Sequence, residues 1–145
     1  MKLFKFCLLI YIFCSGATAF AQAPSDTVRT ASGLKYVVTK EGKGKPATLG
    51  DKVYVRYTGR FPDGRIFDTS DLEGKPIKIK IGKDRIIKGW EEMLLLLQPG
   101  QAVTVVIPPH LAYGNRSIPN PDQQGDVLIP PGSTLIFDLE VVEVK

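Results

Sequence analysis

The stretch Ile86-Ile87-Lys88-Gly89-Trp90-Glu91-Glu92 carries the only tryptophan of this 145-residue chain. It opens an apolar stripe with the i, i+3, i+4 and i+7 spacing of a helix face, formed by Trp90, Met93, Leu94 and Leu97. Pro99-Gly100 predicts the end of that helix. An indole in the first turn of a helix beside a sheet either fills a core seam or forms the floor of a cavity. The other aromatic residues decide between these interpretations.

Strand patterns lie on both sides of this helix. Alternation predicts half-buried strands at residues 52–58, with Val53, Val55 and Tyr57 on one face, and at residues 77–81, with isoleucines on one face. Residues 34–39, 65–69, 103–107 and 135–141 are further strand candidates, and Phe61-Pro-Asp-Gly64 is a turn signal. Five or six antiparallel strands and one short helix predict an α+β domain with the helix laid across a sheet.

Residues 1–21 have the features of a cleavable signal peptide. Lys2 and Lys5 supply positive charge, residues 6–14 are apolar, and Ala19-Phe20-Ala21 is a small-x-small cleavage site. An apolar run of nine residues is much shorter than the roughly 20 that span a bilayer as a helix. We therefore predict export to a periplasmic or secreted location with no stable membrane span. Residues 22–32 are then a flexible leader, and residues 33–145 form the folded domain.

The composition argues against several kinds of chemistry. Both cysteines, Cys7 and Cys14, lie in the predicted signal, so thiol catalysis and thiolate metal sites are not expected in the mature domain. The single histidine, His110, is interpreted as a surface loop residue, since no Gly-x-Ser-x-Gly motif accompanies it. Without Lys2 and Lys5 the chain has 17 basic and 15 acidic residues, which does not indicate nucleic-acid binding. We expect no metal and no cofactor.

Aromatic side chains near strand ends remain as the main candidates for a site. They are Tyr57, Phe67, Tyr113 and Phe137, and each alone is more often a core residue. Asp68 differs, because a carboxylate between Phe67 and Thr69 needs either solvent or hydrogen-bond partners. The hydroxyl of Tyr57 is a candidate partner.

Residues 33–145 resemble the FK506-binding-protein class of peptidyl-prolyl cis–trans isomerases. The matching motifs occur in the family's order and with similar spacing, so together they are more specific than any one of them. They are Val55-Arg-Tyr-Thr-Gly59, Asp63-Gly64, Phe67-Asp-Thr-Ser70, Lys88-Gly-Trp-Glu-Glu92, Gly100-Gln101, Ile107-Pro-Pro109, Leu111-Ala-Tyr-Gly114, Ile129-Pro-Pro131 and Ser133-Thr-Leu-Ile-Phe-Asp138.

The resemblance implies a curled antiparallel sheet wrapped around one short helix, with a pocket between them and Trp90 as its floor. It implies catalytic roles for Tyr57, Phe67, Asp68, Trp90, Tyr113 and Phe137, and substrate contacts for Ile77, Ile86, Ile87 and Ile129. The implied substrates are proline-containing peptides and unfolded exported proteins, and FK506-like macrolides are implied ligands.

Three positions depart from the family pattern. Glu73 replaces an arginine that often pairs with the aspartate, and Lys75 is interpreted as a charge swap that faces the acidic cluster; if Lys75 does not reach Asp68, lower activity or inhibitor affinity is expected. Ile77 replaces an aromatic or leucine, which widens the wall beside the proline. Residues 115–127 form a longer, polar loop that either alters substrate selection or is a tolerated surface insertion.

Two other functions compete with catalysis. A non-catalytic module of the same fold would bind proline-containing segments without accelerating their isomerisation; the presence of Asp68, Trp90 and Tyr113 favours the enzyme. A secreted β-sandwich adhesion domain is disfavoured by the helix and by the lack of regularly spaced strands after it.

Overall fold

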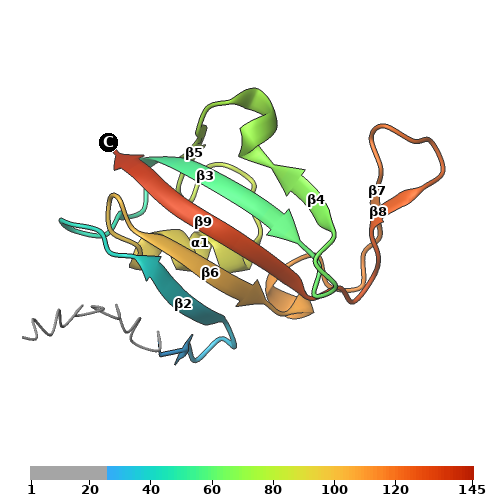
Figure 1. Ribbon diagram of the computed structural model, residues 1–145, viewed down its shortest axis with the longest axis horizontal. Coiled ribbons are helices and arrows are strands. Elements are labelled where there is room, and N and C mark those ends of the chain that lie inside the picture. Colours follow the sequence, from blue (N-terminus) through green and yellow to red (C-terminus); the bar gives the residue numbers. More distant parts are fainter. Residues whose placement is uncertain (1–25) are drawn as a thin grey trace, which may run out of the picture.

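The computed structural model describes residues 26–145, drawn in colour in Figure 1. The predicted signal, residues 1–21, and the first part of the leader lie outside the described residues. Regular structure begins with β1 (Val28–Arg29), which pairs antiparallel with β2 (Lys35–Lys40). A strand therefore lies inside the range 22–32 that was predicted to be a flexible leader. Both residues of β1 are exposed, so the pairing leaves no hydrophobic pattern in the sequence.

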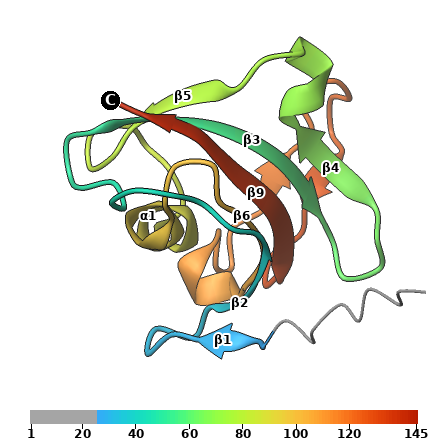
Figure 2. The ribbon, with the colours of Figure 1, turned by 60° about the vertical axis from the view of Figure 1, so that its left-hand side comes forward.

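The α+β prediction is confirmed. Across residues 26–145 one antiparallel sheet has seven strands in the order β1-β2-β6-β9-β3-β4, and β5 also pairs with β3. Its remaining strands are β3 (Lys52–Arg60), β4 (Ile66–Thr69), β5 (Ile77–Lys80), β6 (Ala102–Ile107) and β9 (Leu135–Val144). The sheet curls around α1 (Lys88–Leu96), which Figure 2 shows nearly end-on. All six predicted strands and the helix are present, with ends shifted by three residues or fewer.

The helix lies close to the inner face of the sheet. Met93 and Leu94 are fully buried against core residues of the strands. A side chain at Gly89 would collide with the sheet, since an added Cβ would lie 2.6 Å from Cγ2 of Ile107. This close approach holds the first turn of α1, and with it Trp90, against the end of β6.

One edge of β3 is shared by two short strands. β5 pairs with residues 52–55 of β3 and β4 with residues 58–60, and between them the chain forms the 3₁₀ turn η1 (Ser70–Glu73). Ser70 is buried, and its Oγ accepts a hydrogen bond from the Tyr57 amide at 2.9 Å. The same hydroxyl lies 3.3 Å from the Tyr57 carbonyl oxygen. Ser70 thus takes the place of a strand at the gap and anchors the backbone of Tyr57.

The long segment between β6 and β9 contains structure that the sequence did not predict. After the 3₁₀ turn η2 (Pro109–Leu111), β7 (Ile118–Pro119) and β8 (Val127–Ile129) form a two-stranded hairpin that projects from the body of the domain (Figure 1). A proline is compatible with β7 because this hairpin has only two strands and leaves outer edges free of pairing. Among residues 26–145 no helix has the length and apolarity needed to cross a membrane.

Candidate active site

A cavity of about 670 Å³ opens between the first turn of α1, the inner face of the sheet and the segment after η2. It contains nine of the ten predicted site residues, contributed by β3, β4, β5, α1 with its preceding turn, the segment after η2, and β9. They are Tyr57, Phe67, Asp68, Ile77, Ile86, Ile87, Trp90, Tyr113 and Phe137. Its size is in the range of ligand pockets, ~300–1,000 Å³.

Aromatic rings form the floor and one wall of the cavity. Phe137 is central, with its ring centroid 5.3 Å from that of Trp90 and 5.6 Å from that of Phe67, at interplanar angles of 85° and 89°. Tyr57 meets Trp90 edge to face at 4.9 Å. These T-shaped contacts are the arrangement that aromatic quadrupoles favour. Because Trp90 and Phe137 are also 6% and 4% exposed, the floor of the cavity is at the same time part of the core.

The start of α1 places hydrogen-bond donors at the cavity. Ile87 is the N-cap residue in extended conformation, and its side chain makes no cap. Its carbonyl accepts bonds from the Trp90 and Glu91 amides, whereas its own amide takes part in no hydrogen bond among the described residues. An uncapped first turn leaves amide donors for other partners. The indole Nε1 of Trp90 is the only buried side-chain polar atom of residues 26–145 without a partner there.

The predicted bond between Tyr57 and Asp68 is confirmed. The Tyr57 hydroxyl donates to Oδ2 of Asp68 at 2.8 Å, across the β3–β4 pair. Burial, and then the hydrogen bond to Asp68, raise the pKa of Tyr57 well above its ordinary range. Burial, and then the charge of Asp68, also raise the pKa of Tyr113. Both hydroxyls therefore stay protonated at neutral pH and remain donors.

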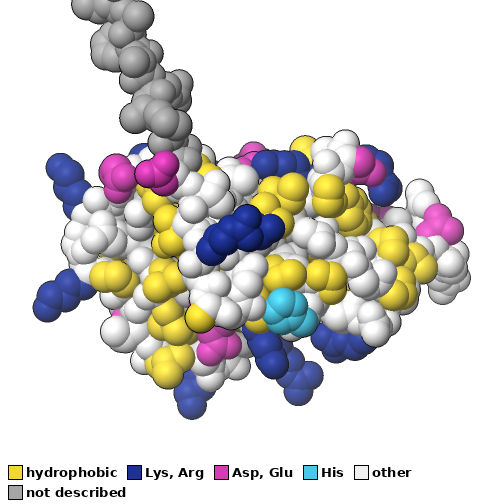
Figure 3. Space-filling model, turned by 90° about the horizontal axis from the view of Figure 1, so that it is seen from below, with side chains coloured by type: hydrophobic (Ala, Val, Ile, Leu, Met, Phe, Trp, Pro, Cys, Tyr) yellow, Lys and Arg dark blue, Asp and Glu magenta, His cyan; other side chains and the backbone are white. Residues whose placement is uncertain are grey.

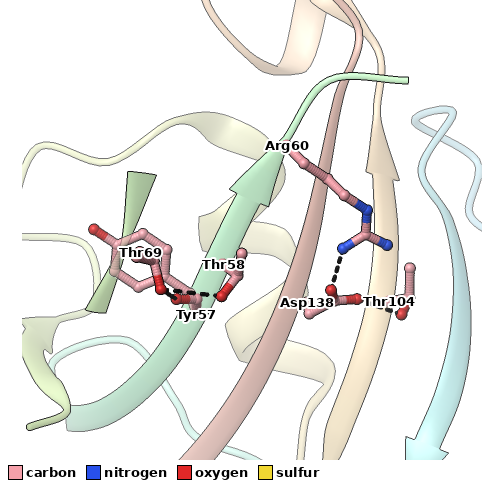
Figure 4. Close-up of polar contacts among 6 residues, drawn as sticks. All are labelled: Tyr57, Thr58, Arg60, Thr69, Thr104 and Asp138. Atoms are coloured by element: carbon pink, nitrogen blue, oxygen red, sulfur yellow. Dashed lines mark hydrogen bonds and ion pairs between the residues drawn. The ribbon is translucent and has the colours of Figure 1, made fainter. Parts of the chain in front are cut away.

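Polar contacts hold β4 in place next to this pair, as Figure 4 shows. The Thr69 hydroxyl lies 3.0 Å from that of Thr58 and 3.1 Å from the carbonyl oxygen of Tyr57. On the outward face of the sheet, Asp138 accepts from Arg60 and from the Thr104 hydroxyl, which links β3, β9 and β6. Asp138 alternates along β9 with buried Phe137, so the outer network and the inner cavity share one strand.

The comparison with known families decides the identity. Residues 43–142 match the family described as FKBP-type peptidyl-prolyl cis-trans isomerase. The chain belongs to this family. The resemblance noted from the sequence motifs is thereby confirmed.

Relatives within the FKBP family have similar sequences and folds. A probable FKBP-type peptidyl-prolyl cis-trans isomerase of Haemophilus influenzae is 42% identical over 83% of this chain, and Escherichia coli FkpA is 41% identical over 85%. The chain spans 46% and 42% of the lengths of these two proteins. Two crystal structures show the same fold. That of Escherichia coli FkpA gives a TM-score of 0.72 at 37% identity, covering 87% of this chain and 54% of that one. The crystal structure of AtFKBP13 gives a TM-score of 0.73 at 34% identity, covering 83% of this chain and 99% of that one.

Two sequence expectations for the FKBP pocket are corrected. Ile129 does not line the cavity: it is 3% exposed, belongs to the hydrophobic core, and pairs with Ile118 in the unpredicted hairpin. Lys75 forms no ion pair with Asp68. Its Nζ lies 3.9 Å from Oε2 of Glu73, the last residue of η1, and both side chains are exposed. A solvated side chain has little to hold it in one geometry, so the nearest carboxylate along the chain becomes its partner.

Four basic residues lie at the cavity, and the sequence analysis assigned none of them to it except through the 115–127 loop, which contains Arg116. They are Arg85, Lys88, His110 and Arg116, all exposed, and they come from segments on both sides of β6. His110 was assigned to the surface alone, but its ring also borders the cavity while Nε2 lies 2.9 Å from the Ser32 carbonyl oxygen. The net charge of the chain is nearly balanced, so it did not indicate this local excess of positive charge. Within residues 26–145 no three His, Cys, Asp or Glu side chains are grouped to hold a metal ion.

Proposed function

We propose that the mature chain is a peptidyl-prolyl cis–trans isomerase that accelerates rotation about Xaa-Pro bonds in exported proteins as they fold. The observation that carries the proposal is the aromatic cavity of about 670 Å³ with hydroxyl and amide donors at its border, in a member of the FKBP family. Export is supported by the charged start, apolar run and cleavage pattern of residues 1–21, which lie outside the described residues.

The energetic demand on such a site is modest. Peptide-bond rotation has a barrier of ~18–20 kcal/mol because planar resonance is lost, and Xaa-Pro isomers exchange in tens to hundreds of seconds. A thousandfold acceleration requires about 4 kcal/mol of selective transition-state stabilisation. The twisted amide is less polar than the planar one, so a water-poor cavity stabilises it relative to bulk water. This is preferential binding of the transition state.

Each side chain is given a role in that scheme. Trp90, Phe67 and Phe137 hold the proline ring on the floor of the cavity. The hydroxyl of Tyr113 and the amide of Ile87 donate to the substrate carbonyls that flank the rotating bond, which restrains the chain during rotation. Asp68, oriented by Tyr57 at 2.8 Å, lies beside the path of the twisting carbonyl.

The catalytic proposal is tested with residues 22–145 and a protease-coupled assay on proline tetrapeptides. Phe67→Ala and Trp90→Ala should lower kcat/KM at least tenfold, because they open the floor to water. Tyr113→Phe should lower it about threefold to tenfold, the value of one hydrogen bond of ~0.5–1.5 kcal/mol. Leu49→Ala, at a side chain that is 67% exposed and outside the cavity, is the control. Unchanged rates in Phe67→Ala and Trp90→Ala would exclude this site.

Binding and catalysis are separated by the fluorescence of the single tryptophan. A proline peptide or an FK506-like macrolide in the cavity should change Trp90 emission, and the macrolide should inhibit the isomerase activity. A non-catalytic module would show the emission change with no acceleration of isomerisation. A folding role predicts that the wild-type domain, and not Phe67→Ala, accelerates a refolding reaction limited by proline isomerisation.

Export is tested separately on the full chain. Expressed in a bacterium, the protein should be recovered from the periplasm or medium with Gln22 as its first residue, as determined by mass spectrometry. Retention in the cytoplasm with Met1 in place would contradict the export part of the proposal and leave the catalytic part standing.

A further inference from the structure

The border of the cavity is strongly biased toward positive charge. Three cationic side chains, Arg85, Lys88 and Arg116, and the imidazole of His110 line it, whereas Asp68 is the only carboxylate among the lining residues. Figure 3 shows the face that carries the histidine, with lysine and arginine side chains above and below it, apolar side chains between them and an acidic side chain nearby. We call these four basic residues the basic rim.

The rim cations have no acidic partner in the domain. Among the described residues, none of Arg85, Lys88 and Arg116 forms an ion pair with a carboxylate. The only hydrogen bond of the Arg116 side chain among the described residues is donated by Nε to the Tyr113 carbonyl oxygen, at 3.4 Å.

The neighbouring acids, in contrast, are engaged elsewhere. Asp68 accepts from Tyr57, Glu73 lies beside Lys75, and Glu92 accepts from the Ser32 hydroxyl at 2.8 Å. Among the described residues no carboxylate is paired with a cation of the rim; Asp68 lines the cavity, and Glu91, three residues after Lys88, carries a further negative charge in the first turn of α1.

The rim flanks both groups that are proposed to bind the substrate backbone. Arg85 and Lys88 stand on either side of Ile86-Ile87, and His110 and Arg116 are three residues before and after Tyr113. A peptide that bonds to the Ile87 amide and the Tyr113 hydroxyl must therefore lay its neighbouring side chains along the rim. The uncapped first turn of α1 adds positive potential at the same border.

We propose that the isomerase selects prolines flanked by acidic residues, with the basic rim as the determinant. The inference rests on the proposed function and names its substrate class. Each exposed ion pair has a small effect, but several cations around one cleft act together on a bound anion. The expected preference for Glu over Gln next to the proline is roughly threefold to tenfold in kcat/KM at low salt. It should diminish as salt rises to about 1 M, where the Debye length is about 3 Å.

The test uses acetylated, amidated peptides of the form Ala-Xaa-Pro-Phe and Ala-Ala-Pro-Phe-Xaa, with Xaa as Glu, Gln or Lys. End-capping removes charges that would mask the effect, and Gln is the uncharged match for Glu. Isomerisation is measured without a protease, by exchange NMR, at about 10 mM and about 1 M salt. The expected order of kcat/KM at low salt is Glu, Gln, Lys, in at least one of the two peptide series.

Substitutions in the basic rim test whether the rim causes the preference for Glu over Gln. Combined Arg85→Gln and Arg116→Gln substitutions should bring the Glu-to-Gln ratio toward one. Arg85→Gln alone should lower the ratio in part, and Lys83→Gln is its matched control, because Lys83 is exposed, two residues from Arg85 and outside the cavity lining, and each substitution removes one positive charge. The control should keep the ratio of the wild-type protein.

The outcomes separate this inference from the proposed function. Acceleration of the Gln peptides with equal rates for Glu and Lys overturns the inference and leaves the isomerase function intact. A ratio that falls as much in Lys83→Gln as in the rim variants also overturns it, since net charge would then explain the preference. Failure to accelerate any peptide overturns both.

Discussion

Gly59→Ala is predicted to disturb the cavity from behind, without altering a lining residue. Gly59 lies in β3 opposite Asp68 of β4 and opposite Phe137 of β9. An added Cβ would lie 2.7 Å from Cε1 of Phe137 and 2.7 Å from Cζ of Phe67. The backbone of Gly59 does not have positive φ, so the conflict is with the two rings rather than with the alanine backbone.

The size of the effect follows from these contacts. To restore ordinary contact at 3.4 Å, each ring edge must withdraw by about 0.7 Å. Phe67 is already packed against Phe61, at a centroid distance of 5.0 Å, so its displacement is resisted. Overpacking of this kind typically costs ~1–3 kcal/mol. A shift approaching 1 Å in positioning groups lowers rates by up to ~10²-fold, and we expect a loss of kcat/KM of at least tenfold.

Urea unfolding and the isomerase assay measure the two consequences together. In a Phe67→Leu background the added methyl gains room, so Gly59→Ala should cost at least about 0.5 kcal/mol less there, which a double-mutant cycle detects. Arg56→Ala, at an exposed position of the same strand, is the control and should change stability by less than about 0.5 kcal/mol. A Gly59→Ala protein with wild-type stability and rate would refute the reasoning.

Three further predictions concern the groups around Tyr57 and the core. Ser70→Ala removes the buried hydroxyl that serves the Tyr57 amide, and urea unfolding should show a loss of ~1–3 kcal/mol. Burial and Asp68 raise the pKa of Tyr57 above its ordinary value of 10.0, so the folded state keeps a proton that the unfolded chain loses. The contribution of Tyr57 to the free energy of unfolding should be full below about pH 10 and decline above it. Urea unfolding between about pH 9 and 11 should therefore show a weaker decline of stability in Tyr57→Phe than in the wild-type protein. Parallel curves of stability against pH for the two proteins would contradict the assignment. Ile129→Val should lower the free energy of unfolding by ~0.5–1.5 kcal/mol and leave kcat/KM unchanged, because Ile129 belongs to the core and does not line the cavity. A loss of rate without a matching loss of stability would show that Ile129 contacts the substrate after all.

Elements with one buried face were predictable from the sequence. In β3 inward residues alternate with outward ones over all nine residues, and in β9 they do so over residues 135–141; the pattern survives because burial acts on every second side chain. β1 and the β7–β8 hairpin were missed because they have two or three residues each and mostly exposed or half-buried side chains. For such short strands the pairing is a matter of backbone geometry, which the hydrophobic pattern does not record.

The candidate site was predictable to the extent that its residues also carry local constraints. Asp68, on a strand beside aromatic residues, needed either solvent or hydrogen-bond partners, and the structure supplies the Tyr57 hydroxyl. Long exposed side chains carry no such constraint. Lys75 lies beside Glu73 instead of Asp68, and the cations of the basic rim come together only through the fold. Ile129 was misplaced because the family motif specified its position in the chain, whereas the hairpin decides which surface it faces.

The floor of the cavity is also part of the hydrophobic core, and this determines which substitutions are informative about mechanism. Trp90 and Phe137 are almost fully buried and contact each other, so truncating either one removes core packing together with the site. A fall in rate for these variants must be compared with the fraction folded under assay conditions. Tyr113 differs, because it is half-buried and its hydroxyl has no hydrogen bond among the described residues. Tyr113→Phe should therefore leave the free energy of unfolding within about 0.5 kcal/mol of wild type while lowering kcat/KM. A loss of stability without a loss of rate would show that the hydroxyl serves the fold and not the substrate.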